Sequence, residues 1–190
     1  FFPEQALSHY FAGYALFNLK EYEKSINFLT SAIQIAFDKL EIQIQSYSMI
    51  AEAYIKLSKY NLSDDAFEKA LEIEPNNAFV LNNYSYNLAL REENLNYALE
   101  MSAKTVELFP DNVSFIDTYA WILYGLERYD EAKKYLEKAI NIMPSTNLTI
   151  LMHYGDVLDK LGQFEKAKQF WQKAIDAGGD KEKIKQRLEN

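Results

Sequence analysis

Side chains that could do chemistry are few in this chain of 190 residues and lie far apart in sequence. It has two histidines, His9 and His153, and no cysteine, which excludes disulfides, thiolate metal sites and cysteine nucleophiles. Asp156 and Asp159 follow His153 at a spacing with which one helix could hold a weakly bound metal ion. Acidic pairs on helices are more often simply solvated, and a histidine on a helix is more often structural than a ligand. We therefore expect no metal site, no cofactor and no enzyme activity.

Composition excludes two further classes of function. The net charge is -8, with 28 acidic against 20 basic side chains, whereas nucleic-acid binding needs a surplus of Lys and Arg to neutralise phosphates. No apolar stretch approaches the roughly 18 to 20 residues that cross a bilayer, so no membrane-spanning segment is expected.

Only six Gly and four Pro accompany 48% hydrophobic residues, which favours helices over a β-rich fold. Because the chain begins with Phe1 rather than Met, we expect a processed or excised fragment.

An internal repeat of about 34 residues predicts the elements that position these side chains. Small residues recur at the eighth place of each copy, where two helices must approach closely: Gly13, Ala51, Ser85, Ala120 and Gly155. Proline at positions 75, 110 and 144 ends the second helix of a unit, and Asn77 and Asn112 can cap the helix that follows. The pattern predicts five helix-turn-helix units, at about 6–39, 44–77, 78–112, 113–146 and 148–181.

Three of the places that depart from the repeat lie in its first three units, and a tail follows the last unit. Leu40 to Gln43 are inserted before the second unit and are expected to prolong its first helix. The turn Arg91 to Asn94 of the third unit carries one extra residue, and the first unit has Phe37 where proline is usual. In the tail, Ile184 and Leu188 lie one turn apart, which predicts a short helix at about 180–189 that covers the C-terminal end.

The spacing of small, aromatic and proline residues resembles the tetratricopeptide repeat family over about nine tenths of the chain. The resemblance implies an all-α fold, a right-handed superhelix of five helix-turn-helix repeats plus a C-terminal capping helix, forming a single array over residues 1–190. It also implies a non-catalytic scaffold that binds other proteins. In this family the first helices line a concave groove with their second, fifth, ninth, twelfth and thirteenth places.

The groove residues that this resemblance implies are aromatic and rich in amides, with little positive charge. Tyr and Trp supply large contact areas, and Asn can pair with both donors and acceptors of a peptide backbone, so we expect the groove to bind a peptide or helical segment of a partner. For each ring, groove contact and burial against a neighbouring helix are both open, whereas Tyr47, Tyr54, Tyr119 and Tyr154 are expected in the core. The expected groove residues are Tyr10, Tyr14, Phe17, Asn18, Ser48, Glu52, Asn82, Tyr86, Asp117, Trp121, Tyr124, Met152 and Asp156.

Other partners and roles remain open at this point. Family members that grip a C-terminal carboxylate do so with Lys, Asn and Arg at places that here hold Tyr10, Tyr14, Phe79 and Asn83, which argues against a carboxylate clamp. The chain could instead associate with itself, space apart the domains of a larger envelope protein, or serve an enzyme complex as an accessory domain. The segment from Leu81 is similar to bacterial tetratricopeptide lipoproteins of the cell envelope, which implies a periplasmic or outer-membrane-anchored location, with the cytoplasm as the alternative.

Overall fold

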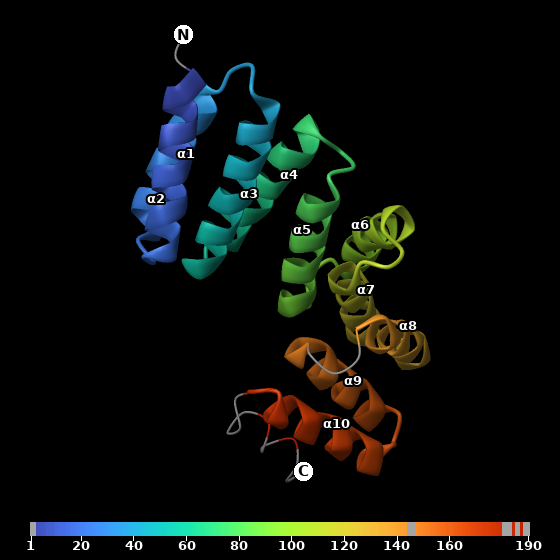
Figure 1. Ribbon diagram of the computed structural model, residues 1–190. Coiled ribbons are helices and arrows are strands. Elements are labelled where there is room, and N and C mark those ends of the chain that lie inside the picture. The colour runs from blue at the N-terminus through green and yellow to red at the C-terminus, as the bar shows by residue number, and fades with distance from the viewer. Residues whose placement is uncertain (1–2, 144–146, 180–183, 185–186, 188–190) are drawn as a thin grey trace. The chain divides into compact units, whose positions relative to one another are not determined.

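The described part of the chain is entirely helical. The computed structural model describes residues 3–143, 147–179, 184 and 187, and these residues form no strand. In four of the predicted repeats the two helices pack against each other, as Figure 1 shows. The helices are α1 (Pro3–Asn18), α2 (Tyr22–Ile35), α3 (Leu40–Lys56), α4 (Tyr60–Ile73), α5 (Ala78–Arg91), α6 (Leu95–Leu108), α7 (Val113–Gly125), α8 (Tyr129–Ile142), α9 (Leu148–Lys160) and α10 (Phe164–Asp176). Each predicted repeat contains two helices, so the all-α fold with two helices per repeat is confirmed.

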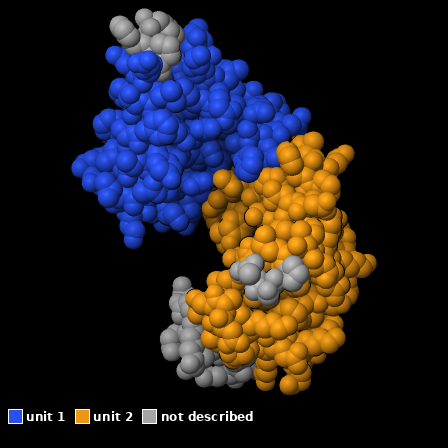
Figure 2. All heavy atoms as spheres, viewed as in Figure 1, with its two compact units in different colours: residues 1–80 blue, residues 81–190 orange. Residues whose placement is uncertain are grey.

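The helices form two compact units, unit 1 (Phe1–Val80) and unit 2 (Leu81–Asn190) (Figure 2). In unit 1, α3 packs against α1, α2 and α4, and Leu29 and Phe67 are fully buried. In unit 2, α7 packs against α6, α8 and α9, and α9 also packs against α10. Ile184 joins the core of unit 2. The rest of the expected cap helix at 180–189, Leu188 included, lies outside the described residues apart from Arg187. The expectation of a single array stays a prediction.

Small residues at the eighth place allow the helices of a hairpin to touch, as predicted. A Cβ on Gly13 would lie 2.6 Å from Cγ of Leu29, and Ser25 Oγ donates a hydrogen bond of 2.7 Å to the carbonyl oxygen of Gly13. A Cβ on Gly155 would overlap the indole of Trp171. Side chains at these two positions would therefore force the paired helices apart.

The turns that join the two helices of a repeat share one geometry in four repeats. The exception is the turn of the third repeat, where an extra residue was predicted. In four units a single residue after the first helix has positive φ: Lys20 (63°), Ser58 (57°), Glu127 (59°) and Gly162 (71°). The third unit has two, Glu92 (55°) and Asn94 (46°). The left-handed residue lets the next amide reach back to a carbonyl of the last helical turn, as Lys59 N does to Tyr54 O at 2.9 Å.

Helix starts also follow the sequence. The Asn112 side chain accepts hydrogen bonds from the amides of Ser114 and Phe115 at 3.0 and 3.2 Å, and Asn77 accepts one from Val80 at 3.1 Å. The four inserted residues prolong the second unit's first helix as expected, because α3 begins at Leu40 and runs for 17 residues.

Tyrosines expected in the core divide into two groups. Tyr154 is buried, and Tyr119 packs against the core of unit 2. Tyr47 and Tyr54 are half-buried, as Tyr119 is, and also line a surface pocket of unit 1 between α2, α3 and α4, so their place in the core stays a prediction.

Candidate partner-binding site

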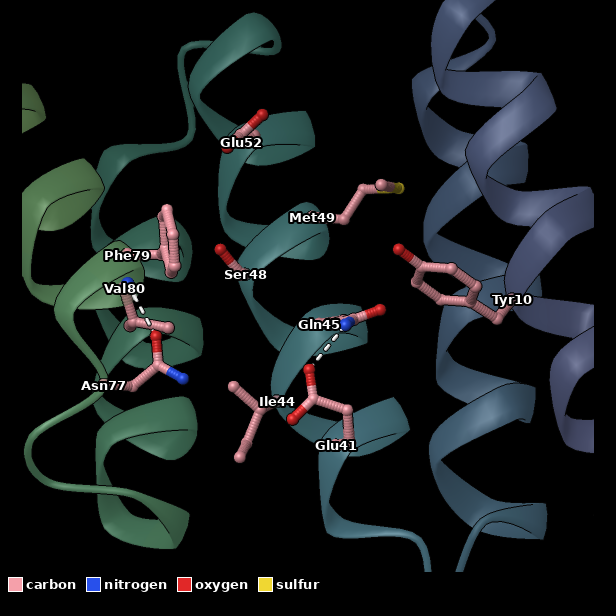
Figure 3. A pocket seen from close by; sticks show the side chains of 10 residues that line it. All are labelled: Tyr10, Glu41, Ile44, Gln45, Ser48, Met49, Glu52, Asn77, Phe79 and Val80. Carbon is pink, nitrogen blue, oxygen red and sulfur yellow. Dashed lines mark hydrogen bonds between the residues drawn. The ribbon is translucent and has the colours of Figure 1, made fainter. Parts of the chain in front are cut away.

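A pocket of about 250 Å³ opens on the first helices of unit 1 (Figure 3). Tyr10 of α1 and one face of α3 form two of its walls, and the start of α5 forms the third. We call it the unit 1 pocket, and its lining is Tyr10, Glu41, Ile44, Gln45, Ser48, Met49, Glu52, Asn77, Phe79 and Val80. Polar and apolar side chains share this lining, a composition suited to a side chain with an alkyl stem and a polar end.

The charged side chains that line the unit 1 pocket are acidic. Its lining contains two carboxylates, those of Glu41 and Glu52, and no Lys, Arg or His. Burial, followed by the negative charges of Tyr14, Glu41 and Glu52, raises the pKa of the Tyr10 hydroxyl above its usual value of 10.0. Glu41 accepts a hydrogen bond of 2.5 Å from Nε2 of Gln45 one helical turn on. The exposed carboxylate of Glu41 therefore favours a cation over an anion at this side of the pocket.

Some of the groove residues expected on α1 and α3 meet in this pocket, namely Tyr10, Ser48 and Glu52. The remaining residues expected on α1 lie outside it. Tyr14 is exposed, and its carbonyl oxygen accepts a hydrogen bond of 3.1 Å from the side-chain amide of the exposed Asn18. Phe17 is half-buried against Tyr22, with ring centroids 5.4 Å apart.

In unit 2, the indole of Trp121 stacks with two other rings from α7 and α9. The rings of Tyr124 and Trp121 are nearly parallel with centroids 4.7 Å apart, and the centroid of the His153 imidazole lies 4.0 Å from that of the indole. His153 Nδ1 lies 2.8 Å from Oδ1 of the buried Asp117. A carboxylate and an indole therefore hold His153, as expected for a structural histidine.

Asp156 is the polar centre of a second pocket, the unit 2 pocket, lined by Trp121, Tyr124, Asp156, Asp159, Lys160, Trp171 and Arg187. It accepts a hydrogen bond of 3.0 Å from Trp171 Nε1. Arg187 donates to both of its oxygens, Nε at 2.7 Å and Nη2 at 3.1 Å. The interpretation of Asp156 as a solvated side chain was wrong, because it is 7% exposed and paired. Among the described residues no group of three or more His, Cys, Asp or Glu side chains could hold a metal ion.

Tyr124 borders the same carboxylate. Burial, then the charges of Asp156, Tyr129 and Asp159, raise the pKa of its hydroxyl to about 12, while Arg187 acts in the opposite direction.

The remaining groove residues of unit 2, Asn82, Tyr86 and Met152, are half-buried. Met152 packs against the core, and burial and the charge of Asp117 raise the pKa of Tyr86. The Oδ1 of Asn82 is buried, and no hydrogen-bond donor among the described residues reaches it.

The sequence did not predict Glu41 and Arg187 as site residues, because both lie outside the repeat. Glu41 belongs to the four inserted residues and Arg187 to the tail, so neither occupies a place of the repeat. A charge that stands just outside a repeated pattern is the signal that could have found them.

A family model described as "Tetratricopeptide repeat" matches residues 4–178. The chain belongs to the tetratricopeptide repeat family. Among curated tetratricopeptide relatives it is similar to "TPR repeat-containing protein PA4667" of Pseudomonas aeruginosa, with 29% identity over 147 residues, which are 75% of this chain and 24% of that protein. It is also similar to the human "Protein O-mannosyl-transferase TMTC1", with 27% identity over 108 residues, 55% of this chain and 12% of that protein. The matched segment is thus a quarter or less of either relative.

Solved structures share the tetratricopeptide fold. PilF of Pseudomonas aeruginosa superposes with a TM-score of 0.79 at 19% identity, covering 95% of this chain and 80% of PilF. MamA of Desulfovibrio magneticus RS-1 superposes with a TM-score of 0.75 at 16% identity, covering 92% of this chain and 95% of that chain. These identities support a common fold and no more. None of the helices in the described part of this chain has the length and apolar character that crossing a bilayer requires.

Proposed function

We propose that this chain is a protein-binding module, which holds a segment of a partner protein on the surface formed by the first helices of its repeats. The observation that carries the proposal is the unit 1 pocket, since it brings Tyr10, Ser48 and Glu52 together on α1 and α3. The tetratricopeptide fold, commonly a scaffold for protein interactions, supports it. The aromatic stack around Trp121 supports a second contact region in unit 2.

The test fills the unit 1 pocket with a bulky side chain. Short random peptides displayed on phage would be selected on the purified chain, and recovered peptides synthesised and titrated calorimetrically. Ser48→Trp places an indole in the unit 1 pocket and is expected to weaken binding by about tenfold or more, an amount that corresponds to about 1.4 kcal/mol.

Thr30→Trp is the matched control, because Thr30 is an exposed small residue of the same unit that lines a different pocket, between α2, α3 and α4. We expect it to bind the selected peptides as the unchanged chain does. Recovery of no peptide, or equal affinity for the unchanged chain and Ser48→Trp, would contradict the proposal.

Self-association is a second candidate, favoured by an apolar face on α1. Leu7, Phe11 and Tyr14 are spaced to share one side of this helix, and their side chains are 43%, 60% and 49% exposed. Light scattering at increasing concentration would detect a dimer, which Phe11→Glu is expected to abolish. Phe164→Glu makes the same change at a 58% exposed ring of unit 2 and is expected to leave it intact. A mass of one chain at every concentration would exclude this role.

An accessory role beside an enzyme is the third candidate. The human relative is named as an O-mannosyl-transferase, and the matched segment covers 12% of it. In that role the present chain would supply binding and another part of the protein or complex the catalysis.

A further inference from the structure

Glu41 gives the unit 1 pocket a charge that the repeat pattern does not contain. It lies in the turn that the four inserted residues add to the start of α3. Among the described residues Gln45 is its hydrogen-bonding partner, and no Lys, Arg or His forms an ion pair with it. An exposed carboxylate at the rim of an acidic, partly apolar pocket attracts a cationic side chain from outside the chain.

Unit 2 shows which cation such a pocket of this chain holds. In the unit 2 pocket the guanidinium of Arg187 forms two hydrogen bonds to Asp156, beside the rings of Tyr124 and Trp171. Asp156 stands at the ninth place of the fifth repeat, and the ninth place of the second repeat is Glu52, which lines the unit 1 pocket. A carboxylate among aromatic rings recurs in both pockets.

We propose that the unit 1 pocket binds an arginine side chain of the partner segment; this rests on the proposed function and specifies the partner's chemistry. The guanidinium pairs with Glu41 at the rim, and the alkyl stem lies on Ile44, Met49 and the exposed ring of Phe79. Arginine is preferred over lysine because its planar fork pairs with a carboxylate through two hydrogen bonds and stacks on aromatic faces, here that of Tyr10. The surplus of acidic over basic residues in the chain favours the same partner charge.

The experiment uses the peptides selected on the full chain. Among those whose binding Ser48→Trp weakens, we expect an arginine at a shared position. Replacing that arginine by citrulline, which keeps the shape and removes the charge, should weaken binding by about tenfold, and lysine should weaken it less. Glu41→Gln should cause the same loss with the arginine peptide and almost none with the citrulline peptide.

Glu23→Gln is the matched control, since it removes the same charge from an exposed residue in the first turn of α2, outside the pocket. We expect it to leave the affinity unchanged. If citrulline peptides bind the unit 1 pocket as tightly as arginine peptides, the arginine site is wrong and the protein-binding function stands. If citrulline weakens binding but Glu41→Gln does not, the arginine binds elsewhere and the inference is overturned. If no peptide is sensitive to Ser48→Trp, the proposed function fails and the arginine site with it.

Discussion

Replacing Gly155 by alanine should destabilise unit 2, although alanine is the better helix former. Gly155 lies in the middle of α9, against Trp171 of α10, and a Cβ at this position would overlap Cδ1 and Nε1 of the indole. Trp171 is 4% exposed, so a shift of the ring disturbs its contacts with buried neighbours. Moving the ring breaks its hydrogen bond of 3.0 Å to Asp156.

The magnitude is the balance of three contributions. Overpacking of a buried contact costs about 1–3 kcal/mol. Loss of a hydrogen bond to a buried carboxylate costs about 1.5–3 kcal/mol, partly offset here because Arg187 still pairs with Asp156. The higher helix propensity of alanine offsets about 1 kcal/mol of these costs. We expect a net loss of about 2–4 kcal/mol in the free energy of unfolding of unit 2.

Urea denaturation followed by tryptophan fluorescence measures this loss. Both tryptophans of the chain, Trp121 and Trp171, lie in unit 2, so the signal reports on that unit. Gly125→Ala is the control, because a Cβ at the end of α7 would lie 3.3 Å from the nearest atom of Leu95, a contact that a small shift relieves. We expect it to be neutral or slightly stabilising.

A second background separates steric overlap from other causes. Trp171→Leu removes the indole that Gly155 accommodates and leaves Trp121 as the probe. In this background Gly155→Ala should cost far less than in the unchanged chain. Steric overlap is refuted as the cause if Gly155→Ala is as stable as the unchanged chain, or if its cost is the same in both backgrounds.

Three further changes test other parts of the structure. Ser58→Gly should stabilise unit 1 by about 1 kcal/mol, because Ser58 holds a φ of 57° that glycine adopts without strain; thermal unfolding by circular dichroism measures it, and a lowered midpoint would speak against this account. Asn147→Ala should cost about 1 kcal/mol by removing the cap that accepts from the amides of Thr149 and Ile150, and an unchanged urea midpoint would show that water replaces it. Tyr124 has a pKa of about 12 in the folded chain against a usual 10.0, so its contribution to stability is complete below pH 10 and is lost as the pH rises towards 12. Tyr124→Phe should therefore flatten the decline of the melting temperature at alkaline pH. An identical decline in the variant and the unchanged chain would disprove the assignment.

The repeat pattern predicts what all five units share. The backbones of two helices can approach this closely only if one helix carries a small side chain where they cross. The spacing of Gly13 and Gly155 is therefore enough to predict their hairpins. The extra residue in the third turn is visible in the sequence because the spacing fails there, and the two left-handed residues of that turn are Glu92 and Asn94. These features are local, and each depends on a few neighbouring residues.

Charge pairing across long stretches of sequence could not be predicted in the same way. Arg187 reaches Asp156 across 31 residues, and nothing in a helical period relates the two. Asp117 and His153 are 36 residues apart and meet because α7 and α9 pack side by side. The sequence places both residues on first helices, but which side chains pair depends on rotamers and on the crossing of α7 and α9.

Residues that break the repeat are therefore the ones expected to distinguish this chain's partners from those of other tetratricopeptide proteins. The repeated places must first satisfy packing, and this demand already occupies Asp117 and Asp156, whose carboxylates pair within the chain. An inserted residue such as Glu41 has no packing role to satisfy and remains exposed at the pocket rim. Deleting the added turn of α3 should thus change which peptides bind while leaving the hairpins intact, because the buried residues of α3 begin after this turn, at Ile44.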